Sequence, residues 1–253
     1  MFKHAIVRKP CEAMVKGLST AKLGKPDYRL ALEQHQDYTA ALRECGLQVI
    51  ELAALADYPD SCFVEDVALI TPKGAILTHP GAPSRRGEVE FIEPAIKQFF
   101  PYPDYIAAPG HVEAGDIMMV GGQFYIGLSA RTNRQGAAQM IRLLNKQGLS
   151  GTMVNMSELL HLKTGLSYIE NNNLLTFGEM HHHPDFSDYK RIQISPEESY
   201  AANSVWINGT VLIPQGFPKA LAAVQALGYK TREVAMSEFQ KLHGGLSCLS
   251  LRF

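Results

Sequence analysis

The feature that most constrains the fold of this chain is a recurring pattern. It consists of an apolar strand, a tight turn, a second apolar strand and then glycine or proline. Four segments carry it in full: 63–81, 112–130, 162–179 and 200–216. The last of these contains Asn208-Gly209, a dipeptide typical of two-residue hairpin turns. A fifth copy, 244–253, has only one strand, and we expect residues 2–10 at the other terminus to supply its partner.

Helical periodicity follows most of these hairpins. Apolar residues spaced three and four apart predict helices at 27–46, 84–100, 130–148 and 218–228. A single strand is expected after each helix, at 47–55, 105–109, 151–156 and 229–236. The hairpin at 162–179 is followed instead by an irregular segment and then by a strand at 191–195. The repeated unit is therefore strand–strand–helix–strand, and one of its five copies is split between the two ends of the chain.

One such unit cannot bury its own apolar faces, whereas five units in a closed ring can. We therefore expect residues 1–253 to form a single α/β domain in which equivalent hairpin positions converge near the ring axis. These equivalent positions hold Asp66, Asp116, Leu166, Asn203 and Cys248. Four of the five are polar or reactive in apolar surroundings, and buried polar groups need either partners or a ligand.

Composition argues against two classes of partner. The chain has 24 lysines and arginines against 25 aspartates and glutamates, a formal net charge of −1, whereas nucleic acids need a basic surface. No segment approaches the roughly 18 consecutive apolar residues of a membrane-spanning helix, so we expect no membrane insertion. The four cysteines show neither metal-site spacing nor a disulfide framework, which favours free thiols in the cytoplasm.

Cys248 is the candidate nucleophile. It follows Gly244-Gly245, and glycines let backbone approach a ligand closely. His161 and Glu113 precede hairpin strands at nearly matching positions of two other copies, so the ring should bring all three to one centre. A cysteine with a histidine partner is the combination that nucleophilic catalysis requires. Alone, each residue has a plainer interpretation, because an isolated cysteine is usually core and an isolated acid often caps a turn.

The surrounding charges fit a guanidinium substrate. This group is planar and cationic, and its N–H groups match carboxylates, which Glu65, Asp66 and Glu113 could supply. The arginines Arg85 and Arg131 follow the first two hairpins, where they could reach a substrate carboxylate. Other polar residues are assigned to structure or solvent: Arg86, Asp116, Asn203 and the run His181-His182-His183, whose consecutive side chains rarely converge on one metal ion.

Several motifs together resemble one family. They are PDSCFVED at 59–66, RRGE at 85–88, VEAGDIM at 112–118, GLSARTNRQG at 127–136, HLKTGLSYIENN at 161–172, EESYAAN at 197–203 and GGLSCLSLRF at 244–253. The chain resembles the dimethylarginine dimethylaminohydrolases of the pentein superfamily over nearly its whole length. Each motif alone is weak, whereas the set is specific.

The resemblance implies a five-bladed, pseudo-symmetric α/β propeller built from ββαβ repeats, with one blade completed by strands from both termini. It implies Cys248 as nucleophile, His161 as general acid and base, and Glu113 as the residue that orients the histidine or the substrate. Further residues are implied to bind substrate: Leu18, Asp60, Glu65, Asp66, Arg85, Arg131 and Leu242. The implied reaction converts Nω-methylated arginine to citrulline and a methylamine through a covalent thiouronium, without cofactor or metal.

Two alternatives stay open. Arginine deiminases share the fold and typically carry His-x-Asp, whereas this chain has His161-Leu162-Lys163, which favours methylated substrates. His243 stands where relatives tend to have aspartate, which leaves the substrate preference open between methylarginine and arginine. The other alternative is a catalytically silent binding protein, against which Cys248, His161 and Glu113 argue together. A homodimer is compatible with exposed edge strands, and the loop at 18–20 is the candidate lid over the site.

Overall fold

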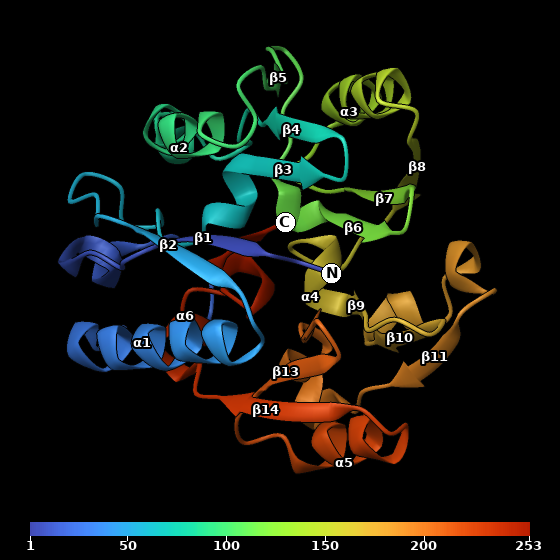
Figure 1. Cartoon of the computed structure of the whole chain (residues 1–253). Coiled ribbons are helices and arrows are strands. Elements are labelled where there is room, and N and C mark those ends of the chain that lie inside the picture. The colour runs from blue at the N-terminus through green and yellow to red at the C-terminus, as the bar shows by residue number, and fades with distance from the viewer.

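The computed structural model describes residues 1–253, and its strands form five three-stranded sheets arranged in a ring (Figure 1). We call these sheets blades 1 to 5: β15-β1-β2, β3-β4-β5, β6-β7-β8, β9-β10-β11 and β12-β13-β14. In each blade two strands pair antiparallel, and the middle one pairs in parallel with the third. The ring of five blades confirms the predicted propeller.

The strands are short, with two to six residues each. Their bounds are β1 His4–Arg8, β2 Gln48–Leu52, β3 Ala68–Thr71, β4 Gly74–Leu77, β5 Asp104–Tyr105, β6 Ile117–Val120, β7 Gln123–Leu128, β8 Ser150–Asn155, β9 Leu166–Tyr168, β10 Asn173–Thr176, β11 Lys190–Gln193, β12 Val205–Ile207, β13 Thr210–Pro214, β14 Lys230–Val234 and β15 Leu251–Arg252. The strand predicted at 105–109 is wrong in extent: β5 covers only Asp104–Tyr105, and Pro109 has no backbone N–H to offer a longer ladder.

Helices connect the middle and last strands of four blades and lie at the periphery of the ring (Figure 1). They are α1 Tyr28–Glu44, α2 Glu88–Lys97, α3 Arg134–Lys146 and α5 Pro218–Ala226, and two single-turn helices are α4 Leu162–Gly165 and α6 Ser237–Gln240. Asp27 and Asn133 cap α1 and α3 by accepting backbone N–H groups of the first turn. Blade 4 has only short 3-10 turns in place of a long helix, as its irregular sequence predicts.

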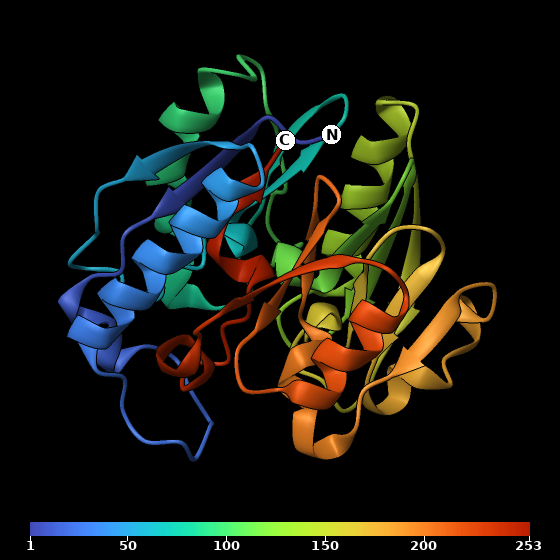
Figure 2. The same ribbon diagram turned by 60° about the horizontal axis from the view of Figure 1, so that its bottom comes forward.

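The two chain termini close the ring within blade 1. Strand β1 lies between β15, to which it is antiparallel, and β2, to which it is parallel. Ile6 faces Leu251 across the first of these pairings, and both side chains are buried in the core between blades 1 and 2. The termini lie at one end of the ring, and the loop before α1 lies at the opposite end (Figure 2). The expectation that residues 2–10 complete the last blade is confirmed.

A short helical turn precedes the first strand of every blade, and this differs from the expectation of strand from the start of each pattern. The five turns are 64–67, 114–116, 162–165, 196–202 and 247–249. Cys248 therefore lies in a turn and not in a strand: its own N–H donates to the carbonyl of Gly245 at 3.2 Å, and Asn203 Oδ1 accepts the N–H of Ser247 at 3.0 Å.

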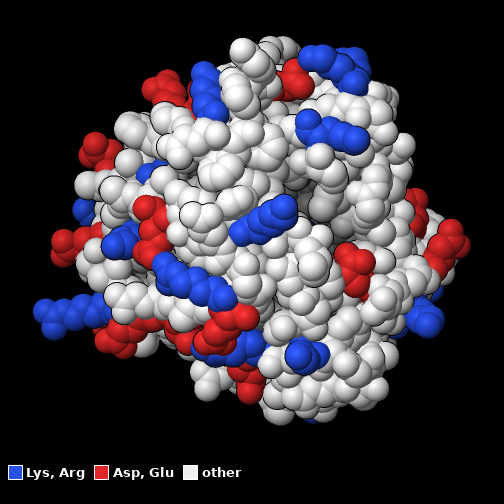
Figure 3. Space-filling model, in the orientation of Figure 1, with Lys and Arg blue, Asp and Glu red and all other residues white.

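No helix is both long and apolar enough to cross a membrane. Acidic and basic side chains are interspersed on the face that carries the termini, and they form no continuous basic field (Figure 3). On this face the distribution agrees with the near-zero net charge.

The closure of blade 1 predicts where truncation of a core side chain is costly. Ile6→Ala should lower the free energy of unfolding by about 2–5 kcal/mol, because Ile6 is fully buried at the closing strand. Leu227→Ala is the matched control, since Leu227 is 45% exposed and its truncation should change stability by at most about 0.5 kcal/mol. Urea denaturation of both variants measures the difference, and equal losses would contradict this role of β1.

Candidate active site

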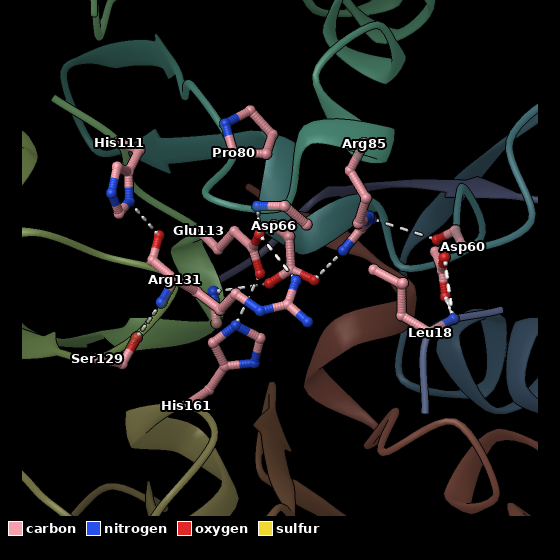
Figure 4. Close-up of polar contacts among 12 residues, drawn as sticks. Leu18, Asp60, Asp66, Pro80, Arg85, His111, Glu113, Ser129, Arg131 and His161 are labelled. Carbon is pink, nitrogen blue, oxygen red and sulfur yellow. Dashed lines mark hydrogen bonds and ion pairs between the residues drawn. The ribbon is translucent and has the colours of Figure 1, made fainter. Parts of the chain in front are cut away.

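A cavity of about 40 Å³ is lined by the loop before α1, which lies at the end of the ring opposite the chain termini (Figure 2). It collects side chains from four blades and from the loop before α1: Leu18, Asp60, Phe63, Asp66, Arg85, Glu113, Arg131, Leu160, His161, Leu242, His243, Gly244 and Cys248. Every residue that the sequence nominated for the site lines this cavity except Glu65. We call it the reaction cavity, and Figure 4 shows most of its polar side chains.

The Cys248 thiol is buried and held from its own turn. The backbone N–H of Gly245 donates to Cys248 Sγ at 3.3 Å. Burial raises the pKa of Cys248 to about 12, and the nearby carboxylates of Glu65 and Asp66 add to this effect. The thiol is therefore neutral at physiological pH in the unliganded protein. It becomes a nucleophile only when something compensates for the surrounding negative charge.

Glu113 and His161 form a buried pair beside this thiol. Glu113 Oε2 lies 2.9 Å from His161 Nε2, and Glu113 Oε1 accepts the N–H of Ala82 at 2.9 Å and contacts Arg131 Nη1 at 3.3 Å. Burial alone would lower the pKa of His161, but Asp116, Asp66 and Glu113 outweigh it and raise that pKa to about 9. Burial opposes ionisation of Glu113, yet its bond to His161 brings the pKa of Glu113 to about 2. The imidazole thus carries a proton that it can donate.

The backbone around His161 is fixed from the neighbouring blade. His161 precedes the single-turn helix α4, and the N–H of Leu162 donates to Asp116 Oδ1 at 2.9 Å. The other oxygen of Asp116 accepts the hydroxyl of Ser129 at 2.7 Å. Asp116 is fully buried and does not line the reaction cavity, which agrees with its assignment to structure.

Arg85 and Asp66 form a second buried pair on the other side of Glu113 (Figure 4). Arg85 also binds both oxygens of Glu88, and its Nη2 donates to the carbonyl of Phe63 at 2.9 Å. Asp66 Oδ1 accepts the N–H of Gly115 at 3.1 Å. Most donors of Arg85 are therefore already satisfied by the protein. Glu88 received no role from the sequence, although its spacing of three residues from Arg85 is a signal for such a pair.

Asp60 and Leu18 lie at the far side of the cavity. The N–H of Leu18 donates to both oxygens of Asp60, at 3.0 and 3.3 Å (Figure 4). Burial raises the pKa of Asp60, while Arg85 and the N–H of Leu18 act against this shift. Leu242 lies in the same region. Its Cδ1 packs against Gly17, the residue before Leu18, so closely that a Cβ on Gly17 would lie 3.1 Å from it. The loop before α1 is thus tied down at the rim of the cavity.

Glu65 is the one nominated residue that the structure does not bring into the reaction cavity. Its carboxylate lies 2.6 Å from Lys163 Nζ and 3.3 Å from Arg252 Nη2, and it accepts the hydroxyl of Ser247 at 2.7 Å. It faces a second cavity of about 160 Å³, on the side of the chain termini, where the surface is hollowed near its centre (Figure 3). Glu65 and Asp66 are consecutive residues of one helical turn, and their side chains face different cavities. A residue pattern alone does not reveal this.

Two groups of side chains bear on metal binding. Asp66, Glu113 and His161 place candidate ligand atoms within 4.8 Å of one another, but all three also bind protein groups. In the run 181–183, His181 binds the hydroxyl of Thr176 at 2.9 Å, and His183 binds the carbonyl of Asn155 at 2.9 Å. These two histidines turn to different partners, as expected for a loop and not for a metal centre.

Comparison with known proteins places the chain in a family. The family model described as arginine deiminase matches residues 53–203. The dimethylarginine dimethylaminohydrolase of Pseudomonas aeruginosa is 53% identical over 100% of both chains. That of Streptomyces coelicolor is 32% identical and covers 99% of this chain and 96% of its own.

Solved structures agree. A cysteine-to-serine variant of the Pseudomonas aeruginosa enzyme complexed with citrulline has a TM-score of 0.99 at 53% identity, covering 100% of both chains. The N-terminal domain of ArgZ, a cyanobacterial arginine dihydrolase, has a TM-score of 0.86 at 18% identity, covering 98% of this chain and 96% of its own, which shows a shared fold. With full-length identity above half to a curated relative, this chain belongs to the dimethylarginine dimethylaminohydrolase family.

Proposed function

We propose that this protein hydrolyses Nω-methylated arginines to citrulline and a methylamine through a covalent intermediate on Cys248. The observation that carries the proposal is the Glu113–His161 pair beside the Cys248 thiol, inside a cavity that also holds Asp60 and Asp66. Such a cavity offers a nucleophile, a protonated acid and carboxylates for a cation, which is the set that attack on a guanidinium carbon requires. Relatives that are 53% and 32% identical to this chain carry the matching name.

The substrate would be held at both ends. In our proposal the guanidinium binds between the carboxylates of Asp66 and Glu113, and its charge offsets their negative charge. The amino acid end would lie towards Asp60 and Leu18, with Arg131 and Arg85 facing its carboxylate. Because most donors of Arg85 already bind Asp66 and Glu88, we assign the larger share of carboxylate binding to the half-buried Arg131.

The first half of the reaction forms the covalent intermediate. A bound cation next to Cys248 favours the thiolate, because it compensates for the acids that raise the thiol pKa. Sγ attacks the guanidinium carbon and forms a carbon–sulfur bond. His161 gives its proton to the methylated nitrogen, the carbon–nitrogen bond breaks, and the methylamine leaves. A positively charged thiouronium remains on Cys248.

The second half consumes one water. His161 is now neutral and takes a proton from that water as its oxygen attacks the same carbon. Collapse of the tetrahedral species breaks the carbon–sulfur bond, and its hydroxyl proton passes to the departing sulfur. Cys248 returns as the neutral thiol of the resting state, leaving citrulline. Glu113 keeps the imidazole oriented in both halves and stabilises its charged form. Leu162-Lys163 supplies no second acid to the cavity, since Lys163 is paired with Glu65 on the other side, and this supports methylated over plain arginine as substrate.

Three further expectations are part of this proposal: they concern the domain organisation, the cellular compartment and the oligomeric state. We take residues 1–253 to act as one catalytic domain on a small guanidino compound. The cysteines Cys11, Cys45, Cys62 and Cys248 are all free thiols, which fits a reducing compartment such as the cytoplasm. A homodimer stays a prediction; outer strands such as β8 have one hydrogen-bonded neighbour and leave an edge to pair.

The direct test is citrulline formation from asymmetric dimethylarginine, with plain arginine in a parallel reaction. Citrulline should form from the methylated substrate, and Cys248→Ser should reduce it to background because serine is a far weaker nucleophile here. Cys62→Ser is a matched control, since Cys62 is equally buried but does not line the reaction cavity. Product mainly from plain arginine would move the function to a deiminase, and no product from either would point to a binding protein.

The pair at the site also predicts a pH dependence. The productive state has a Cys248 thiolate and a protonated His161, one proton fewer than the resting state. The resting enzyme loses its first proton at a pKa of about 9, so kcat/KM should rise with pH up to that value. Glu113→Gln removes a carboxylate that raises the pKa of His161. The rising limb should then move to lower pH and its plateau should fall, and an unchanged limb would exclude this role of Glu113.

A further inference from the structure

The loop that rims the reaction cavity is attached on its outer side to His243. The N–H of Thr20 donates to His243 Nε2 at 3.2 Å, and Thr20 Oγ1 lies 3.0 Å from the same nitrogen. Ser19 adds a neighbouring bond, because its hydroxyl donates to the carbonyl of Lys241 at 2.6 Å. With Leu18 bound to Asp60 on the inner side, residues 18–20 are held at both edges of the site.

His243 occupies a position that links three regions. It lines the reaction cavity together with Cys248, and it also lines a larger outer chamber of about 650 Å³, which we call the vestibule. The vestibule is lined in part by Thr20, in the segment 18–20 that we call the rim loop, and by Leu23 just after it. The backbone of His243 has φ of +60°, a left-handed conformation that is uncommon for histidine and directs its ring from the Cys248 loop towards Thr20.

The contact to Thr20 depends on the protonation of the imidazole. A backbone N–H can only donate, so His243 Nε2 must offer its lone pair, with the ring proton on Nδ1. An imidazolium has a proton on both nitrogens and cannot accept this bond. Protonation therefore sets the N–H of Thr20 against a second N–H donor, and the Thr20 hydroxyl, which can accept from Nε2–H, becomes the only partner of the ring on the loop.

We propose that His243 is a positioning residue that holds residues 18–20 over the reaction cavity while it is neutral and releases them when it is protonated. Of the contacts that hold this segment, the one to His243 links closure of the site to the protonation of an imidazole.

The surroundings of His243 favour the neutral form. Burial lowers its pKa, and the positive charges of His161 and Arg131 across the reaction cavity lower it further. Other charged groups face the same two cavities: Asp60, Asp66, Arg85, Glu113, Lys22 and Glu158. Because only the neutral ring can accept the N–H of Thr20, closure is fully favoured above the ordinary histidine value of about 6.5 and weakens as the pH falls below it.

Substrate binding should reinforce the contact, and this consequence rests on the proposed function. A guanidinium in the reaction cavity adds a positive charge near His243, which further disfavours the imidazolium. Binding of the cation and closure of the rim loop then support each other.

Trypsin cleavage after Lys22 tests the proposal without any assay of activity. Lys22 and Leu23 are exposed and directly follow the loop, so cleavage of their bond reports how often the loop opens. In the unliganded wild type, cleavage should be faster at about pH 5.5 than at about pH 8, after normalisation to an unstructured peptide with the same bond. His243→Phe keeps a ring but no acceptor. It should be cleaved about fivefold faster than wild type at the higher pH and should lose the pH difference.

Ser19→Ala is the matched control, because it removes a loop contact that does not titrate. It should speed cleavage at both pH values and retain the wild-type difference between them. His243→Asn guards against misfolding, since asparagine tolerates the left-handed conformation and should behave as His243→Phe does. Wild-type cleavage rates in either His243 variant, or an intact pH difference, would overturn the proposal. Neither result depends on whether methylated arginine is the substrate.

Discussion

The structure depends on hydrogen bonds that join the five turns around the ring axis. Asp66 accepts the N–H of Gly115 from the next turn, Asp116 that of Leu162, and Asn203 that of Ser247. The remaining two junctions use Asn203 Nδ2 to the carbonyl of Lys163 and the hydroxyl of Ser247 to Glu65. Each blade is thus bound to its neighbour at the axis. Because these groups are buried, losing one partner would leave the other unsatisfied, which makes the closed ring a cooperative unit.

This arrangement explains how one repeat yields both scaffold and site. At equivalent positions, Asp66, Asp116 and Asn203 bind the following turn, whereas Cys248 makes no such bond and lines the cavity. The junction at blade 1 is carried instead by Ser247, one residue earlier. The chain can therefore place a reactive side chain at the axis without opening the ring. His161 is placed in the same way, because the bond from the N–H of Leu162 to Asp116 fixes the backbone beside it.

The sequence predicted the repeated elements of the fold and missed features that depend on where individual side chains point. Alternating apolar residues and the Asn208-Gly209 turn identified the blades, and the repeat brought Cys248, His161 and Glu113 together. The same pattern could not show that residues 64–67 form a helical turn, so that Glu65 and Asp66 face different cavities. Nor could it show that Thr20 meets His243, because that contact is set by packing between segments far apart in the chain. The ion pair between Arg85 and Glu88 was missed although the spacing of three residues is a signal for it.

The acids and cations of the reaction cavity offset one another, so no positive charge is left for a Cys248 thiolate until a cationic substrate arrives. Asp60, Asp66 and Glu113 face Arg85, Arg131 and a protonated His161, and Asp66 is already paired with Arg85. In this setting the Cys248 thiolate would be one more negative charge in a buried site, which is why the thiol pKa is high. A guanidinium supplies the missing positive charge at the atom to be attacked. The nucleophile is therefore formed where its substrate is bound, and a neutral molecule of the same shape would leave the thiol protonated and weakly reactive.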